Sequence, residues 1–189
     1  MNRGKIRAFI AIPLPAGVKK RVEAFQRSLK RCDPRVRWVK PDNMHLTLKF
    51  LGDIPEQRTA EIAAALNRVV LKLSPFSATI EGAGSFPSKR KPRVLWVGIE
   101  RGRKELKNLA LQVDTSLAAL GVTREKRPFS PHITVGRVKS LKNIEKVTAA
   151  MEHEWSGGEF PVSTINLMKS RLTPAGARYS CVHTLELEG

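Results

Sequence analysis

Two short segments of the chain share a pattern of side chains that suits acid–base chemistry. They are His45-Leu46-Thr47-Leu48 and His132-Ile133-Thr134-Val135, each a histidine and a threonine separated and followed by an apolar residue. In a β-strand, residues i and i+2 point to the same face, so each segment presents an imidazole beside a hydroxyl while its apolar residues face the core. The sequence therefore predicts two small polar faces of the same composition.

Paired histidines of this kind suit the cleavage of a phosphodiester. An imidazole has an unperturbed pKa of about 6.5, so one ring accepts a proton while the other donates one. One histidine would activate water or a ribose hydroxyl, and the other would protonate the leaving oxygen. The two threonine hydroxyls would donate hydrogen bonds to the non-bridging oxygens and, with basic groups, stabilise the developing charge.

The two motifs lie about half of the 189-residue chain apart. Each is followed by a predicted helix and then by a strand near a Phe-Pro pair, Phe86-Pro87 and Phe160-Pro161. This weak internal repeat predicts two similar lobes that meet around a pseudo-twofold axis, with both motifs in one cleft.

The other two histidines of the chain lack this setting. His153 lies at a charged helix end and is expected to be solvated. His183 is followed directly by Thr184, whose side chain would point to the opposite face of its strand. We therefore expect neither His153 nor His183 to be catalytic.

Other chemistries fit the sequence less well. Asp42 and Asp53 flank the first motif in expected turns, but nothing comparable flanks the second, so a zinc or manganese ligand set is incomplete. The Gly-x-Ser-x-Gly nucleophile elbow of a Ser-His-Asp hydrolase is missing. The segment Gly82-Ala83-Gly84-Ser85 lacks the Gly-Lys-Ser/Thr that completes a phosphate-binding loop. We expect neither a metal nor a nucleotide cofactor.

The charge of the chain indicates an anionic partner. Thirty-four Lys and Arg against 17 Asp and Glu give a formal net charge of +17, as expected of a protein that binds nucleic acid, although an organism with generally basic proteins would also produce it.

Length and composition predict one soluble domain. A chain of 189 residues, 41% of them hydrophobic, fits one compact domain over residues 1–189. Neither a signal peptide nor an apolar stretch of about 18 residues is present, so no membrane association is expected. Cys32 and Cys181 have no metal-ligand spacing and are too few for a disulfide framework, which favours a reducing cytoplasm, although the two could pair with each other. No segment indicates a dimer interface, and a monomer is expected.

Helical and strand patterns alternate along the chain without a low-complexity linker. Strands are predicted at about 6–12, 36–39, 45–51, 77–83, 93–99, 132–138, 161–168 and 179–187. Helices are predicted at about 15–31, 55–73, 102–120 and 141–153. Pro55 is expected in a first helical turn, and Gly121 as the residue that closes the third helix.

Several ordered segments, taken together, resemble the two-histidine (2H) phosphoesterases, in particular the RNA 2′,3′-cyclic phosphodiesterases known as LigT-like proteins or 2′-5′ RNA ligases. The resemblance covers nearly the whole chain. It is carried by segments 7–12, 38–52, 84–87, 92–96, 129–137 and 170–174, which read RAFIAI, WVKPDNMHLTLKFLG, GSFP, PRVLW, FSPHITVGR and SRLTP.

The resemblance implies an α+β fold of two pseudo-symmetric lobes, each an antiparallel sheet backed by helices, around a central cleft. It also implies metal-independent hydrolysis of RNA 2′,3′-cyclic phosphate ends to 2′-phosphate ends, with 2′-5′ ligation as a secondary capability. His45 would be the proton donor to the departing 3′ oxygen and His132 the proton acceptor that activates water. Thr47 and Thr134 would hold the phosphate oxygens.

Further residues are candidates for substrate binding. Arg137 matches an arginine that follows the second motif in the family, and a bulge at Gly136 would bring it to the face of His132. Phe9 faces away from the core side of its strand and could stack on a terminal base, or pack in the core instead. Lys49 shares parity with His45 and could add positive potential in the cleft, or form a salt bridge at the strand end.

A basic loop and three alternatives complete the predictions. Residues 88–93 form a basic loop that could contact the RNA backbone or remain a solvated turn. A 2H enzyme could instead act on a small cyclic nucleotide or on a 2′-5′ linked oligonucleotide. The chain could also be an RNA-binding module without catalysis.

Overall fold

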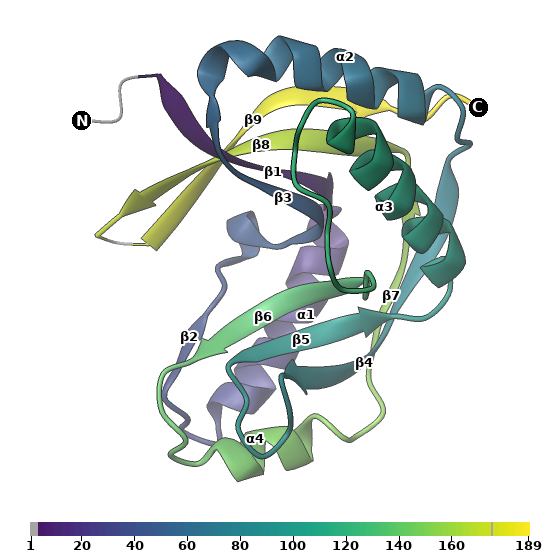
Figure 1. Ribbon diagram of the computed structural model, residues 1–189. Coiled ribbons are helices and arrows are strands. Elements are labelled where there is room, and N and C mark those ends of the chain that lie inside the picture. Colours follow the sequence, from purple (N-terminus) through teal and green to yellow (C-terminus); the bar gives the residue numbers. More distant parts are fainter. Residues whose placement is uncertain (1–3, 175) are drawn as a thin grey trace.

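The computed structural model describes residues 4–174 and 176–189, and their strands form one curved antiparallel sheet (Figure 1). The strands are β1 (Lys5–Pro13), β2 (Val36–Trp38), β3 (His45–Pro55), β4 (Phe76–Phe86), β5 (Val94–Ile99), β6 (His132–Val138), β7 (Ser156–Val162), β8 (Thr164–Thr173) and β9 (Gly176–Glu186). Their order is β7-β4-β5-β6-β3-β1-β8-β9, and β2 pairs with β6.

Four α-helices and two short 3-10 turns connect these strands in the described residues. The helices are α1 (Ala16–Lys30), α2 (Thr59–Val70), α3 (Arg103–Ala118) and α4 (Ile144–Ala150). The turns are η1 (Pro41–Asn43), just before β3, and η2 (Glu56–Arg58), directly after it. Each of the longer helices buries an apolar stripe at intervals of three and four residues, which on α3 consists of Leu106, Leu109, Ala110, Val113 and Leu117.

The sheet divides where β3 meets β6, since their described register consists of one pair, Leu46 with Ile133. On one side, β3, β1, β8 and β9 form the first lobe, which α2 and α3 cover (Figure 1). On the other side, β6, β5, β4 and β7 form the second lobe, which α1 covers. The predicted α+β architecture of two lobes is confirmed.

Helix α1 packs on the lobe opposite to that of the strand preceding it. It follows β1 of the first lobe, yet its Phe25 ring stacks on Trp155, 4.5 Å away between centroids, beside β7 of the second lobe. The two lobes are therefore joined by packing as well as by the sheet.

Most of the predicted elements are present, with errors at several ends and one wrong strand. The predicted strand at 161–168 is wrong, because it merges β7 and β8, which Ser163 separates. Two glycines and Pro161 conceal β7 in the sequence, and an edge strand tolerates them. The prediction of Pro55 in a first helical turn is wrong: Pro55 ends β3 and directly precedes η2, and α2 begins at Thr59. Gly121 has the positive φ of +79° expected of a residue that closes α3.

Candidate active site

The two His-Thr motifs lie side by side at the centre of the sheet. Leu46 and Ile133, the middle residues of the motifs, are paired and fully buried. Continuing this antiparallel register places each histidine opposite the threonine of the other motif. Two imidazoles and two hydroxyls thus share one polar face around a local pseudo-twofold axis.

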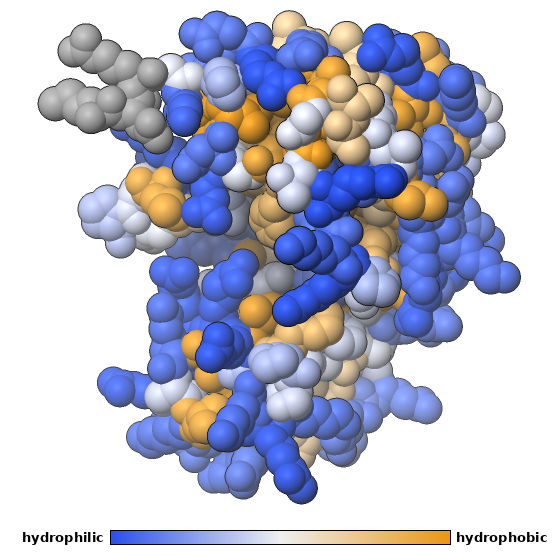
Figure 2. All heavy atoms as spheres, in the orientation of Figure 1, coloured by the Kyte–Doolittle hydropathy of each residue, from blue (hydrophilic) through white to orange (hydrophobic). Residues whose placement is uncertain are grey.

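The surface is recessed between the lobes on the face shown in Figure 2. The recess lies at the left, below the β8–β9 hairpin, and polar side chains predominate around it. The histidines and threonines of the motifs are all partly exposed. The polar face of the motifs is therefore accessible to a ligand that enters between the lobes.

Both imidazoles are oriented by the same local hydrogen bond. Nδ1 of His45 is 2.8 Å from the carbonyl oxygen of Asn43, and Nδ1 of His132 is 2.7 Å from that of Ser130. A carbonyl accepts but cannot donate, so Nδ1 of each ring carries the hydrogen. Each neutral ring thus keeps an unprotonated Nε2 that can accept a proton, and each charged ring can donate one from Nε2.

Burial and nearby cations keep both imidazoles neutral in the free protein. Burial lowers the pKa of His45 from 6.5 to about 4; the Asn43 carbonyl opposes this shift, and Lys19 and Arg137 add to it. Burial and Arg137 lower the pKa of His132 below 6.5, against the opposing effect of the Ser130 carbonyl. An anion bound between the rings would favour the charged form of either one.

The substitution Arg137→Gln should raise the pKa of both histidines. The guanidinium disfavours each imidazolium, so its removal favours protonation of both rings. NMR titration of the ring Cε1 protons should show both midpoints at higher pH than in the wild type, with His45 still below 6.5 because its burial remains. An upward shift of only one histidine would contradict the shared position of Arg137, and His183 serves as the internal control.

Aromatic rings enclose the imidazole of each motif. The ring of His45 lies 4.8 Å from that of Phe9 and 5.2 Å from that of Tyr179. The ring of His132 lies 5.1 Å from Phe86 and 6.4 Å from Trp96. The sequence patterns did not identify Tyr179, Phe86 and Trp96 as neighbours of the site. Phe86 belongs to the first Phe-Pro pair, and Trp96 ends the PRVLW segment that contributes to the family resemblance.

Phe9 is a wall of the site rather than an open platform. It lies on the side of β1 that faces His45, as predicted, but only 3% of its surface is exposed. The rings of His45, Phe50 and Tyr179 surround it. The prediction that a base stacks on Phe9 is therefore wrong for this arrangement, because Phe9 is buried against rings of the site itself.

A β-bulge follows the first motif on β3. Thr47 pairs with Ala11, whereas the next pair joins Lys49 to Ile10, so Leu48 is an extra residue. Because the bulge shifts the alternation by one position, Lys49 and Phe50 face the sides opposite to those that the sequence pattern predicts, until a second extra residue at Leu51 restores the alternation.

Lys49 accordingly turns away from the cleft. It is 2% exposed, and its Nζ donates hydrogen bonds to Oδ1 of Asp114 at 2.5 Å and to the carbonyl oxygen of Thr123 at 2.8 Å. The prediction that Lys49 adds positive potential to the cleft is wrong. The alternative of a salt bridge is correct, and it joins the motif strand to α3.

Asp114 is the centre of a hydrogen-bond network that runs from buried Lys49 to exposed Arg124. Its carboxylate also accepts hydrogen bonds from the backbone N–H of Glu125 at 3.1 Å and from Nε of Arg124 at 3.2 Å. Burial alone would raise the pKa of Asp114, but the hydrogen bonds from Lys49, Glu125 and Arg124 and the charge of Lys49 lower it overall. The network holds the start of the loop that leads to the second motif.

A second bulge follows the second motif on β6, at the equivalent position. Thr134 pairs with Trp96 and Gly136 with Leu95, so Val135 is an extra residue. The predicted bulge at Gly136 is thus confirmed. The residue after Gly136 lies on the same face of the sheet as Thr134.

Arg137 is exposed on that face, and a buried glutamine supports the bulge that places it there. Gln26 of α1 is 1% exposed, and its Nε2 donates to the carbonyl oxygens of Val135 at 2.7 Å and Val39 at 2.9 Å. The Val135 carbonyl, which lies in the bulge, also accepts a hydrogen bond from the backbone N–H of Val39 at 3.0 Å, so Gln26 ties the bulge to α1. Gln26 is a further residue of the site's framework that sequence reasoning missed, because nothing in its helical pattern distinguishes it.

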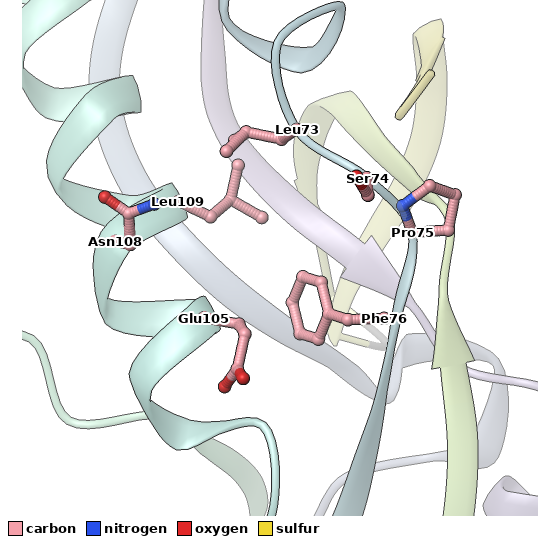
Figure 3. A pocket seen from close by; sticks show the side chains of 7 residues that line it. All are labelled: Leu73, Ser74, Pro75, Phe76, Glu105, Asn108 and Leu109. Atoms are coloured by element: carbon pink, nitrogen blue, oxygen red, sulfur yellow. The ribbon is translucent and has the colours of Figure 1, made fainter. Parts of the chain in front are cut away.

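Other features of the described residues complete the description. Residues 4–174 and 176–189 contain no group of three or more His, Cys, Asp and Glu that could hold a metal ion, and no helix among them could span a membrane. In the basic loop, Lys89 pairs with Glu152. A hollow of about 250 Å³ lies between the α2–β4 connection and α3, away from the motifs (Figure 3). Its lining is Leu73, Ser74, Pro75, Phe76, Glu105, Asn108 and Leu109.

Comparison with known sequences yields one family. The family described as LigT like Phosphoesterase matches twice, over residues 12–96 and 97–179. An RNA 2′,3′-cyclic phosphodiesterase of Methanothermobacter thermautotrophicus is 36% identical over 185 residues, covering 97% of this chain and all of that protein. One of Aquifex aeolicus is 34% identical, covering 97% of this chain and 98% of that protein.

Solved structures show the same fold. The protein TT0787 of Thermus thermophilus superposes with a TM-score of 0.82 at 29% identity, covering 97% of this chain and 99% of that one. E. coli LigT complexed with 3′-AMP superposes with a TM-score of 0.81 at 26% identity, covering 98% of this chain and 99% of that one.

Proposed function

The chain belongs to the LigT-like phosphoesterases and is an enzyme, and from this premise we propose that it hydrolyses the 2′,3′-cyclic phosphate ends of RNA to 2′-phosphate ends. The relatives that are 30–36% identical carry the name of that activity. The observation that supports it in this chain is the pairing of two histidines and two threonines at the centre of the sheet.

The proposed reaction uses the two histidines in opposite roles. Nε2 of neutral His132 takes a proton from water as the water oxygen bonds to phosphorus. The bond between phosphorus and the 3′ oxygen breaks, and that oxygen receives the proton of charged His45. Thr47 and Thr134 donate hydrogen bonds to the non-bridging oxygens. The products are a 2′-phosphate and a 3′-hydroxyl, and proton exchange with solvent restores both rings.

The charge of Arg137 has two opposing effects in this scheme. In the free protein it disfavours the imidazolium of both histidines. With substrate bound, it stabilises the negative charge that grows on the phosphate oxygens. The bound phosphate also favours charged His45, so the acid acquires its proton as the substrate binds.

Ligation of RNA ends through a 2′-5′ bond would use the same groups. If a ribose 5′-hydroxyl of a second RNA takes the place of water, His132 deprotonates it, and its oxygen bonds to phosphorus. Departure of the 3′ oxygen then leaves a 2′-5′ linkage. We include this ligation as a secondary activity of the proposed site.

Product analysis in the presence of a chelator tests the proposed function. A short RNA with a 2′,3′-cyclic phosphate end should be hydrolysed at the same rate with and without excess EDTA. Comparison with standards by mass spectrometry and chromatography should identify a 2′-phosphate, since the 3′ oxygen leaves. Exclusive formation of the 3′-phosphate would contradict the proposed roles, and RNA binding without turnover would support a module without catalysis.

Two small substrates in the same experiment test the alternative that the enzyme acts on a nucleotide. A 2′,3′-cyclic mononucleotide and a 2′-5′ linked dinucleotide should both give a lower kcat/KM than the oligonucleotide, because the net charge of +17 attracts a longer polyanion more strongly. Faster turnover of either small molecule would assign the site to a nucleotide instead of an RNA end.

A further inference from the structure

Strands β2 and β6 carry two arginines that lie directly opposite each other. Arg37 of β2 pairs with Arg137 of β6, and both are exposed. Like charges at directly opposite positions of an antiparallel pair repel each other and destabilise the sheet. Within residues 4–174 and 176–189, neither guanidinium forms a salt bridge that would offset this repulsion. An arrangement that lowers stability in this way favours a role in binding an anion.

Both guanidinium groups lie on the face of the two motifs. Arg137 reaches that face because of the bulge in β6. A Cβ added to Gly136 would come within 2.6 Å of Val36 and 3.2 Å of Trp38, so these two side chains of β2 lie on the other face. Arg37 stands between them in the sequence and therefore shares the face of Arg137.

A second pair of cations continues this arrangement along the same two strands. The backbone N–H of Lys139 donates to the carbonyl oxygen of Arg35 at 2.8 Å, so the chains stay paired one residue before β2 begins. Both side chains are exposed and lie two positions from the arginine pair, hence on the same face. In the part of the chain that the structure describes, neither has a carboxylate partner. We call Arg35, Arg37, Arg137 and Lys139 the basic track.

The basic track extends outward from the histidines. Arg137 lowers the pKa of both motif histidines. Arg37 is not among the charges that shift the pKa of either ring, so it lies farther from them. Two residues of a strand advance about 6.5 Å, which is close to the separation of consecutive phosphates in a nucleic-acid strand. The ends of β2 and β6 lie at the left of the second lobe, below the recess between the lobes (Figures 1 and 2).

We propose that the basic track binds the internucleotide phosphates that precede the cyclic phosphate of an RNA end, a role that rests on the proposed function. Arg37, beside Arg137, holds the first internucleotide phosphate, and Arg35 with Lys139 holds the second. Each phosphate relieves the repulsion within its pair of cations. Because these contacts involve the backbone alone, they select RNA ends of two or more nucleotides without reading the sequence.

The test removes charge from the protein and from the RNA separately. Two dinucleotides with a 2′,3′-cyclic phosphate end are compared, one with a natural linkage and one with a neutral methylphosphonate linkage. In the wild type at about 0.1 M salt, the neutral linkage should raise KM about fivefold, as expected for the loss of one phosphate contact. Arg37→Gln should raise the KM of the natural dinucleotide about fivefold and that of the methylphosphonate less than about twofold. The value of kcat should change less than about twofold in each case.

A trinucleotide extends the test to the second pair. In the wild type it should have a KM about fivefold below that of the natural dinucleotide, since it brings one more phosphate. Arg35→Gln should reduce this advantage to less than about twofold and leave the dinucleotide unaffected. An equal effect of Arg35→Gln on both lengths would overturn the assignment of the second phosphate.

The β8–β9 hairpin provides a matched control, Arg178→Gln. Arg178 also lies directly opposite an arginine, Arg171, and both are exposed. The adjacent pair contains Tyr179, whose ring faces that of His45, so the control pair faces away from the motifs. Arg178→Gln changes the net charge by the same amount as Arg37→Gln but should keep the difference of about fivefold between the two dinucleotides.

Stability and binding measurements make the outcomes distinct. Arg37→Gln should melt at a temperature no lower than that of the wild type, because one of two repelling charges is gone, and a clear loss of stability would overturn the role in binding. Equal effects of Arg37→Gln on the natural and neutral dinucleotides would overturn the basic track and leave the proposed function intact. If neither dinucleotide is hydrolysed, affinity for the corresponding dinucleotides with 2′-phosphate ends tests the track alone. A loss of about fivefold on Arg37→Gln, confined to the natural linkage, would then retain the track and lose the proposed function.

Discussion

Replacing either His45 or His132 with alanine should lower kcat for a cyclic-phosphate RNA by about 10²–10⁴-fold, because each ring transfers a proton in the same step. Hydrolysis should be measured at saturating substrate in EDTA, and far-ultraviolet circular dichroism should show that both variants fold. Neither ring belongs to the buried core, so no large loss of stability is expected.

The chain provides matched controls for these variants. His153→Ala and His183→Ala remove histidines that lie outside the paired motifs and should leave kcat unchanged. Wild-type activity in either His45→Ala or His132→Ala would exclude the two-histidine mechanism.

The same variants assign the acid and the base. A substrate whose 3′ oxygen is replaced by sulfur has a leaving group that needs little protonation. It should restore much of the activity of His45→Ala and little of that of His132→Ala, because only the acid becomes dispensable. The opposite result would exchange the two roles.

The second large effect concerns stability and comes from the buried pair of Lys49 and Asp114. Asp114→Leu should reduce the free energy of unfolding by about 3–5 kcal/mol, since it leaves the Lys49 ammonium buried beside one carbonyl. Lys49→Met should cost less, because the Asp114 carboxylate keeps the guanidinium of Arg124 and the N–H of Glu125. Urea unfolding measures both.

The double variant separates pairing from packing. Lys49→Met with Asp114→Leu replaces both charges by apolar groups, so it should be more stable than Asp114→Leu alone. A double variant as unstable as the sum of the two single changes would show that the ion pair itself is not the cause. Exposed Arg101→Ala, which removes a surface salt bridge to Glu159, should change stability by less than about 1 kcal/mol and serves as the control.

The sequence predicted the elements of the site well, because they depend on local patterns. Alternating apolar residues indicated both motif strands, and their half-chain spacing indicated the two lobes. The partners of those strands depend on contacts between distant residues, which no local pattern records. The hydrogen bonds from Gln26 of α1 to the second bulge are one example, because Gln26 and Val135 lie far apart in the chain.

The error at Lys49 has a clear physical origin. Strict alternation assumes an unbroken ladder, and the extra residue at Leu48 exchanges the face of Lys49 before a second extra residue at Leu51 restores the alternation. At the second motif, Gly136 gave a visible signal of the bulge and allowed Arg137 to be placed. At the first motif the equivalent position is Lys49, which carries no such signal in the sequence.

The packing of α1 on the second lobe affects how the whole chain unfolds. The first matched half, residues 12–96, contributes β3 to one lobe and α1, β4 and β5 to the other, while β8 and β9 return from the C-terminal half to complete the first. Neither lobe corresponds to a continuous stretch of chain. A proteolytic cut near residue 97 would therefore release no stable fragment, and the two lobes should melt as one cooperative unit although a cleft divides them.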